Sequence, residues 1–425
     1  MKKTITAVLA LSVLAGSLAS CRSADDQGSI GGRPVQARVE QEADRETDPE
    51  DDEEHSAADS YREFSFDLLN ALCAESPDGQ NFMVSPASLM LALQSVNIGA
   101  RGTTRDEITD ALFPGSTYED GYGFSAVLNG ILEGEYDNTA VSSCNSVWIN
   151  DRITDAVNEE YLDQVREDLG ASVNVVPFDA DTPSVINDEI REQTNGMIDG
   201  IIDHIEPTDV MFLINTIAFE GAWLEEFPEG NDEEGIFVNS SGIEENVTYM
   251  NRNERLYIES DIATGFIKGY YGPYCFIAIL PSDDSLSANE FAASFTSEDY
   301  MDLLASRTGD IDLDVTVPKF SFDSELTLDD CLQTLGIETA YDPFAADLTG
   351  IADLSELYIS EVIQNTHIDL DEHGTSASAA TSVCLDTLGL HIRSAHVELN
   401  RPFMFVIAET DTYTPVFIGT VNSIG

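Results

Sequence analysis

The sequence predicts an α+β protein with mostly antiparallel sheets, because most helical patterns lie in its first half and strand patterns dominate its second half. A near-continuous apolar run at residues 211–219 is typical of a buried strand. Two apolar runs near the C-terminus, joined by six residues, are typical of a hairpin. No internal repeat occurs in the 425 residues. The order of the motifs favours one large folded domain over the two or three that length alone suggests.

The expected elements follow one another along the chain. Helices are expected at residues 61–75, 89–99, 103–112, 155–169, 183–203 and 326–335. Strands are expected within 81–88 and at 140–149, 211–219, 276–280, 311–322, 403–408 and 415–421.

The N-terminus is typical of an export signal, with Lys2 and Lys3 followed by an apolar stretch at residues 7–19. The stretch ends in Leu18-Ala19-Ser20-Cys21, which resembles a bacterial lipobox. The resemblance implies that residues 1–21 form a lipoprotein signal and that Cys21 carries the lipid, which anchors the exported protein to a membrane. The alternative is an ordinary signal peptide in which Cys21 has no role.

Residues 22–60 are expected to form a disordered linker. They hold 13 acidic and 4 basic residues and no aromatic residue. Such a segment cannot bury enough apolar surface to offset the entropy lost on ordering. Its like charges repel one another and extend it, so we expect it to hold the folded domain, residues 61–425, away from the membrane.

The folded domain is itself strongly acidic, with 66 Asp and Glu against 13 Lys and Arg, a net charge of −53. The charge is spread along the sequence, which favours a general adaptation to solvent over one charged site. Molar salt shortens the Debye length to about 3 Å and screens such repulsion, so the composition predicts a halophilic protein. A basic footprint is absent, and nucleic-acid binding is not expected.

After Cys21, the cysteines are odd in number and form no CxxC pair, so neither a zinc site nor a disulfide framework is expected. We expect most of them to be small buried apolar side chains, with Cys384 in an exposed loop. They are Cys73, Cys144, Cys275, Cys331 and Cys384.

The segment at residues 371–381 is the most informative part of the chain, because small side chains follow a glycine there. Gly374 permits backbone conformations that other residues avoid. In an extended strand Thr375, Ala377, Ala379 and Thr381 would all face one side, where they could enter a tight slot in a sheet. The alternative is a plain surface linker, and residues 382–395 are expected to continue as a loop.

Six pieces of sequence, in this order, resemble the serpin family over nearly the whole folded region. They are Asn81-Phe82-Met83-Val84-Ser85-Pro86-Ala87-Ser88, residues 215–223, Val317-Pro318-Lys319-Phe320, Leu335-Gly336-Ile337, the segment 371–381 and Asn400-Arg401-Pro402-Phe403. The resemblance implies the serpin fold, a large central and mostly antiparallel β-sheet with further sheets, a helical cluster and an exposed reactive loop. It also implies a monomeric inhibitor that traps a serine protease covalently when the cleaved loop inserts into the sheet.

The resemblance assigns three sets of residues. The hinge of the loop comprises Glu372, Gly374, Thr375, Ala377, Ala379, Ala380 and Thr381. The shutter and breach beneath the sheet opening comprise Ser85, Ser88, Asn215, Trp223 and Gln364, where Gln364 replaces the family's usual histidine. The serines could also be an ordinary turn and helix cap. The scissile bond is expected at Leu388–Gly389, with Arg393–Ser394 as the alternative, and Leu388 suits a chymotrypsin- or subtilisin-like enzyme.

Catalysis, a metal and a cofactor are not expected, since no GxSxG, HExxH, phosphate-binding or dinucleotide-binding motif occurs. Asp371, His373 and Ser376 superficially resemble a hydrolase triad, but three residues so close in a flexible loop cannot hold the required geometry. His367 alternates with apolar neighbours and is expected on the outer face of a strand. Two alternative functions remain: a non-inhibitory serpin that acts as a surface binding protein, and a hydrolase.

Overall fold

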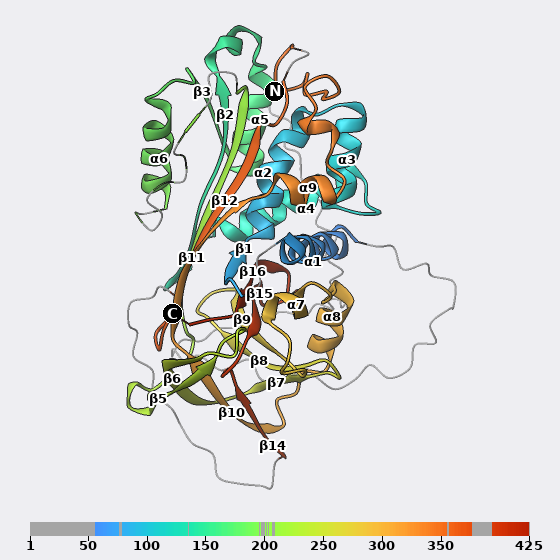
Figure 1. The fold of residues 1–425 in the computed structure, drawn as a ribbon. Coiled ribbons are helices and arrows are strands. Elements are labelled where there is room, and N and C mark those ends of the chain that lie inside the picture. The colour runs from blue at the N-terminus through green and yellow to red at the C-terminus, as the bar shows by residue number, and fades with distance from the viewer. Residues whose placement is uncertain are drawn as a thin grey trace, which may run out of the picture. The chain divides into compact units, whose positions relative to one another are not determined.

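The computed structural model describes residues 56–75, 79–134, 136–194, 196, 200, 202, 204–205, 209–354, 357–375 and 393–424. The predicted signal and lipobox Cys21, most of the linker and residues 376–392 lie outside this range. The described part has the predicted α+β fold, with three sheets and nine α-helices (Figure 1). No helix in this part of the chain combines the length and the apolar character needed to cross a membrane.

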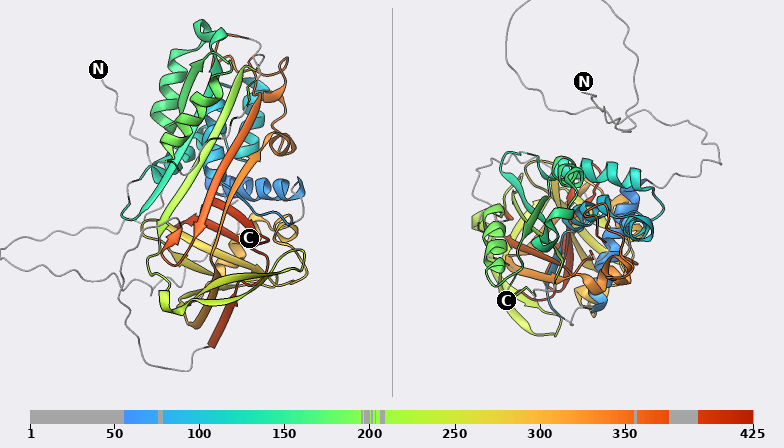
Figure 2. Two further views of the ribbon diagram at one scale, coloured as in Figure 1. Left: turned by 60° about the vertical axis from the view of Figure 1, so that its left-hand side comes forward. Right: turned by 90° about the horizontal axis from the view of Figure 1, so that it is seen from above.

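The central sheet has the strand order β11-β12-β13-β4-β2-β3. Its strands are β2 (Thr139–Asn150), β3 (Ser172–Val176), β4 (Met211–Ala222), β11 (Phe320–Thr327), β12 (Glu361–Leu370) and β13 (Gly374–Thr375). Figures 1 and 2 both show the long strands β2, β4 and β12 side by side. Most pairs of the sheet are antiparallel. Two pairs are parallel: β2 with β3 at the edge, and β12 with β4 from Glu361↔Phe212 to His367↔Ala218.

Two further sheets complete the strands of the described part. One has the order β1-β16-β15-β9-β8-β7, with β1 (Phe82–Val84), β7 (Leu256–Glu259), β8 (Ala263–Gly269), β9 (Tyr274–Pro281), β15 (Phe403–Glu409) and β16 (Pro415–Val421). The other has the order β14-β10-β6-β5, with β5 (Glu233–Val238), β6 (Glu244–Glu254), β10 (Ile311–Pro318) and β14 (Arg393–Glu398).

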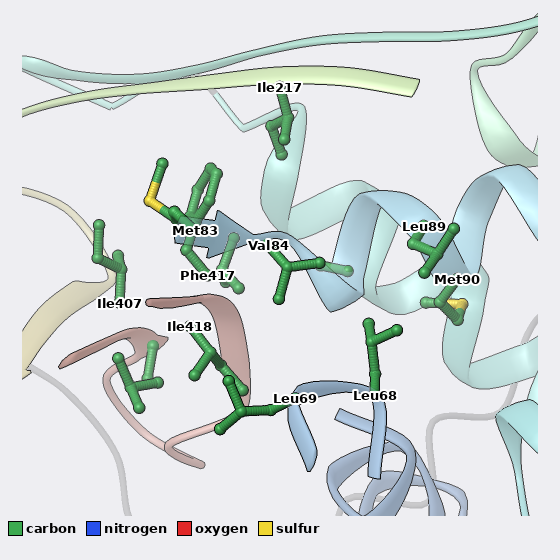
Figure 3. Close-up of a cluster of buried hydrophobic side chains, with 14 of the residues drawn as sticks. Leu68, Leu69, Met83, Val84, Leu89, Met90, Ile217, Ile407, Phe417 and Ile418 are labelled. Atoms are coloured by element: carbon green, nitrogen blue, oxygen red, sulfur yellow. The ribbon is translucent and has the colours of Figure 1, made fainter. Parts of the chain in front are cut away.

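Helix α2 (Pro86–Gly99) lies at the centre of the main core, because every one of its residues is buried. Pro86 occupies its first turn, where no backbone N–H is needed, and the Ser85 side chain accepts the Ser88 N–H as a cap. Its apolar side chains meet those of α1, β1 and β16 beneath Ile217 of β4 (Figure 3). The structure thus places the central sheet directly over a fully packed helix.

The remaining α-helices of the described part are α1 (Ala57–Glu75), α3 (Gly102–Leu112), α4 (Tyr118–Leu132), α5 (Glu159–Leu169), α6 (Thr182–Gln193), α7 (Ala288–Ala292), α8 (Ser297–Ala305) and α9 (Asp329–Thr334). Helix α6 belongs to a second, separate core. Its Ile186 and Ile190 pack with Trp148 of β2, Phe212 and Ile214 of β4 and Ile363 of β12. This second core therefore spans the parallel pair of β4 and β12.

Several predicted boundaries are wrong. The helix predicted at 155–169 begins at Glu159, and the helix predicted at 326–335 begins at Asp329 because residues 326–327 end β11. The helix predicted at residues 183–203 ends at Gln193. The strand predicted at 311–322 is two strands in different sheets. The chain crosses over at Lys319, where the in–out alternation changes phase: odd-numbered residues are buried up to Val317, and Phe320 and Ser324 are buried after it. Residues 393–395 belong to β14 and not to a loop. Residues 57–60, assigned to the linker, begin α1, and Ser60 is fully buried there.

Candidate functional site

A tight turn at residues 371–374, which we call the hinge turn, lies at the end of the central sheet where β12 stops. It reverses the chain after β12, since Asp371 N–H donates to Gly374 O at 2.9 Å. The Asp371 carboxylate accepts the N–H groups of His373 (2.8 Å) and Gly374 (3.1 Å). A short polar side chain that binds its own following backbone is a common way to fix a turn.

The two residues that follow the turn, Gly374 and Thr375, already form a strand between β12 and β4. Thr375 pairs with Leu370 on one side and with Gly221 on the other, and Gly374 pairs with Ala222. Both new pairs are antiparallel. The hinge turn and β13 therefore make a β-hairpin with β12 whose second arm starts a new central strand.

Close packing explains the glycine at this position. A Cβ atom on Gly374 would lie 2.0 Å from Gly221 O and 2.9 Å from Ala222 Cα. Thr375, only 1% exposed, shares a 2.7 Å hydrogen bond between its hydroxyl and that of Tyr270. The entry point for a new strand thus accepts a glycine and then a small hydroxylated side chain.

The stacked rings of Trp223 and Tyr270 pack against the hinge turn. Trp223 stacks on Tyr270 with ring centroids 4.3 Å apart, and its Nε1 donates to Asp371 O at 3.0 Å. The next two carbonyls of the turn are also bound: Trp223 N–H donates to His373 O (2.8 Å) and Phe227 N–H donates to Glu372 O (3.0 Å). Three successive carbonyls of the turn are therefore held by the segment 223–227.

Lys268 and Lys319, the two lysines of the folded domain, both lie at this site. Lys268, 3% exposed, sits against the rings of Trp223 and Phe227, with Nζ 5.2 Å and 4.6 Å from their centroids. It pairs with Glu254 and donates to Glu225 O at 2.7 Å. Burial lowers the pKa of Lys268, and Glu254 partly offsets this effect.

Lys319 ties the base of the hinge to the body of the protein. Its Nζ lies 2.6 Å from Glu372 Oε2 and 2.8 Å from Asp232 Oδ2. Partial burial opposes the charged forms, but the hydrogen bonds and opposite charges prevail, so the pKa of Glu372 is lowered and that of Lys319 is raised.

Further down the sheet, a buried polar network joins the start of α2 to β2, β4 and β12. Gln364 Oε1 accepts Ser85 N–H at 2.6 Å, and its Nε2 donates to Ser85 O at 3.0 Å and to Asn215 Oδ1. Asn215 Nδ2 in turn donates to Ser88 Oγ at 2.5 Å and to Asn145 Oδ1. All five side chains are at most 8% exposed.

The bond between Gln364 and Asn215 spans the parallel pair of β12 and β4, because these two residues lie opposite each other. A strand that entered between β12 and β4 would separate them. Glutamine supplies the donor and the acceptor that such a position needs, and it carries no charge that changes with pH. The network is thus a closed latch across the parallel pair.

The structure brings together the described members of the predicted site. Glu372, Gly374, Thr375 and Trp223 meet at the hinge turn, whereas Ser85, Ser88, Asn215 and Gln364 form the network below. Arg393 and Ser394 begin β14, where they pair with Ile311 and Asp312 of β10. The other predicted members lie outside the described residues: Ala377, Ala379, Ala380, Thr381, Cys384, Leu388 and Gly389.

Sequence reasoning missed several members of the site, namely Asn145, Tyr270, Lys268, Lys319 and Asp232. One signal pointed to two of them: a chain with only four lysines places Lys268 and Lys319 in its folded domain. Tyr270 and Asn145 had no such signal, because each occupies an ordinary strand or strand-end position.

The triad-like residues are not arranged for catalysis. Asp371 uses its carboxylate to bind backbone N–H groups of the turn, and the His373 ring faces Glu226, with Nδ1 3.7 Å from Oε2. Within the part of the chain that the structure describes, no group of three or more His, Cys, Asp or Glu residues is placed to hold a metal ion. Cys73, Cys275 and Cys331 are buried, as expected for small apolar side chains.

The hairpin of β12 and β13 starts a new strand inside the central sheet. This arrangement is typical of proteins that insert part of their own chain into that sheet. Residues 59–424 match the family model described as Serpin (serine protease inhibitor), and the chain belongs to the serpin family. Members of this family are typically protease inhibitors and not enzymes, so the chain is not an enzyme.

Relatives cover nearly the same extent of the chain. An uncharacterized serpin-like protein of Methanosarcina mazei is 28% identical over 381 residues, which are 87% of each chain. The crystal structure of tengpin, a thermophilic serpin, in the native state gives a TM-score of 0.78 at 34% identity and covers 89% of this chain and 96% of that chain. The latent state of tengpin gives a TM-score of 0.72 at 30% identity, with 87% and 98% covered.

Proposed function

We propose that this serpin is an irreversible, suicide-substrate inhibitor of a chymotrypsin- or subtilisin-like serine protease. The observation that carries the proposal is the seating of Gly374 and Thr375 between β12 and β4. Insertion of the whole loop keeps the strand order of the sheet, because the loop only extends β13, which already lies between β12 and β4. Strand addition of this kind gains main-chain hydrogen bonds on both sides of the new strand.

The register of β13 supports the mechanism. Continuing the pairs of Thr375 by nine further residues reaches Glu361 on β12 and Phe212 on β4, the far ends of the parallel pair. Insertion would therefore replace one parallel ladder by two antiparallel ones, and antiparallel pairing is slightly more stable per residue. The closed latch of Gln364 and Asn215 opposes it until the loop is cut.

The trap works as a race between two steps. The protease cuts the loop and is held as an acyl-enzyme while the freed strand enters the sheet. From Glu372 to Leu388 is a stretch of 17 residues, which spans about 55 Å when extended. An enzyme joined to Leu388 is carried that far before it can hydrolyse the bond.

The position of the scissile bond remains part of the proposal, and we place it at Leu388–Gly389. The pairing of Arg393 and Ser394 with β10 supports this choice over Arg393–Ser394, because a protease needs an extended backbone that is free of the sheet. A bond inside a hydrogen-bonded strand is a poor substrate.

The experiment that tests the function is incubation with chymotrypsin and with subtilisin in molar KCl, followed by a denaturing gel and N-terminal sequencing of the C-terminal fragment. We expect a complex that resists denaturation and a fragment that starts at Gly389. Leu388→Glu should prevent attack by both enzymes, and Arg393→Glu is the matched control. Cleavage without a stable complex would favour a non-inhibitory serpin that acts as a surface binding protein.

The same proposal includes export, a lipid anchor at Cys21 and adaptation to high salt. The lipobox-like Leu18-Ala19-Ser20-Cys21 and the acidic residues that follow it support the anchor. The distribution of carboxylates supports the adaptation, since Glu254 and Glu409 are the two buried acidic residues of the described part. The inhibitor would then act as a monomer at the cell surface or outside the cell.

A further inference from the structure

His373 has a backbone that is fully engaged in the hinge turn and a side chain that is not. Its N–H donates to the Asp371 carboxylate, and its carbonyl accepts the Trp223 N–H. Its ring is buried enough that Nδ1 contacts no water, yet this nitrogen has no hydrogen-bond partner. A buried polar atom without a partner is uncommon and calls for an explanation.

Carboxylates surround the ring. Glu226, on the segment that binds the carbonyls of the hinge turn, has Oε2 3.7 Å from Nδ1, with side-chain exposures of 19% for Glu226 and 23% for His373. Asp371 and Glu372 flank it on its own turn. The cations on this side already have partners. Lys319 pairs with Glu372 and with Asp232 on the neighbouring segment. Arg252 donates to the Glu226 carbonyl and pairs with Glu225, and Lys268 donates to the Glu225 carbonyl.

We propose that His373 is a positioning residue for loop insertion, which fixes the hinge turn to the segment 223–227 when its ring carries a proton. The role rests on the proposed inhibitory function, since insertion is the reaction that it serves. A protonated ring donates from Nδ1 to the Glu226 carboxylate and adds a side-chain tie to the three backbone bonds. A neutral ring makes this tie only in one of its tautomers and without the charge.

The consequence is a hinge that is held more firmly in mildly acidic solution. Protonation of the ring turns the contact with Glu226 into an ion pair, so the tie strengthens as the pH falls. At still lower pH the Asp371 carboxyl, whose pKa is raised by burial, takes up a proton. The protonated carboxyl is a weaker acceptor for the N–H groups of His373 and Gly374, so the hinge turn becomes less stable again.

Trp223 reports this event directly. Its ring stacks on Tyr270, which bonds Thr375, and its Nε1 bonds Asp371 O. Unseating the hinge therefore changes both the stacking and the hydrogen bonding of the indole. The chain has one other tryptophan, Trp148 in the second core, so Trp148→Phe leaves Trp223 as the one emitter.

The test is the emission of Trp223 in the Trp148→Phe protein between pH 5.5 and 8.5, without any protease, at the lowest salt that keeps the protein folded. We expect a single transition, and a hinge-docking equilibrium that shifts about two- to fivefold, the range of partly exposed ion pairs. His373→Gln and Glu226→Gln should each abolish it. His367→Gln, which removes the histidine paired with Asp323 elsewhere on β12, should leave it unchanged.

A transition that survives His373→Gln, or that His367→Gln removes, overturns the proposal. So does a flat emission in the parent protein. The protease assay is read separately: wild type should give a higher ratio of complex to cleaved product at pH 6 than at pH 8, and His373→Gln should remove the difference. A His373-dependent emission change in a protein that traps no protease would overturn the inhibitory function and keep the hinge contact.

Discussion

Replacing Thr375 by arginine should turn this inhibitor into a substrate. Thr375 is 1% exposed, and its one polar partner is the Tyr270 hydroxyl at 2.7 Å. An arginine there would bury a charge next to the Trp223–Tyr270 stack, where the nearby carboxylates of Asp371 and Glu372 are already bonded.

The increase in the free-energy barrier to insertion is the sum of two costs. Losing the hydroxyl bond costs about 1 kcal/mol, and burying an uncompensated charge costs about 3 kcal/mol or more. Because Thr375 already lies in the sheet, the arginine would keep residue 375 out of the sheet in the uncut protein. Insertion after cleavage would then meet a barrier about 4 kcal/mol higher and be roughly 1,000-fold slower, since each 1.36 kcal/mol is a factor of ten. Hydrolysis of the acyl-enzyme then precedes insertion, and the protease leaves active.

The assay compares complex and cleaved product on a denaturing gel for three variants beside wild type. Thr375→Arg should give cleaved product alone. Thr375→Val loses only the hydroxyl bond and should slow insertion about fivefold. Ser376→Arg is the matched control, because alternate residues of a strand face opposite sides and this arginine would point away from the core. A wild-type amount of complex with Thr375→Arg would refute insertion at β13.

Three further predictions concern stability and location. The thermal midpoint should rise steeply between 0.1 M and 3 M KCl as the −53 charge is screened, and a constant midpoint would contradict the halophilic adaptation. Cys21→Ser should move the protein from the membrane fraction to the soluble fraction and leave inhibition intact; unchanged fractionation would rule out the anchor. Burial raises the pKa of Asp329 from 3.8 to about 6, so the folded state loses stability as the pH rises through this range. Asp329→Asn, which can still accept the Val362 N–H, should therefore raise the free energy of unfolding by about 1 kcal/mol at pH 7.5, after allowance for solvent exposure, and by nothing near pH 3.

The sequence predicted the fold class and the buried strand β4 well, because their signals are local. Met211–Ala222 is apolar almost throughout, and helices cover both faces of its sheet. The change of sheet at Lys319 was missed although it has a local signal: the apolar residues occupy odd positions up to Val317 and even positions from Phe320. Helix α6 ends early because Gly196 takes a left-handed conformation (φ +82°) and its N–H donates to Arg191 O at 2.8 Å, a common way to end a helix.

The residues of the site also fall into those that the sequence could predict and those that it could not. Gly374 and Thr375 were predictable, because the need for small residues at an insertion point appears in the composition. Tyr270 and Asn145 were not, because their importance comes from contacts with residues 105 and 70 positions away. The environment of His373 is of this second kind: the sequence placed it near Asp371, but only the fold turned its ring towards Glu226.

The scarcity of lysine gives the hinge an unusual chemical sensitivity. Reagents that acylate amines normally scatter over a protein surface, but the folded domain here offers them Lys268, which is buried, and Lys319, whose side chain is 28% exposed. Acetylation of Lys319 would remove its charge and release Glu372, the residue on which the hinge begins. Immobilisation or dye labelling through amines would therefore alter the moving part of the molecule first, whereas coupling through surface carboxylates would spare it.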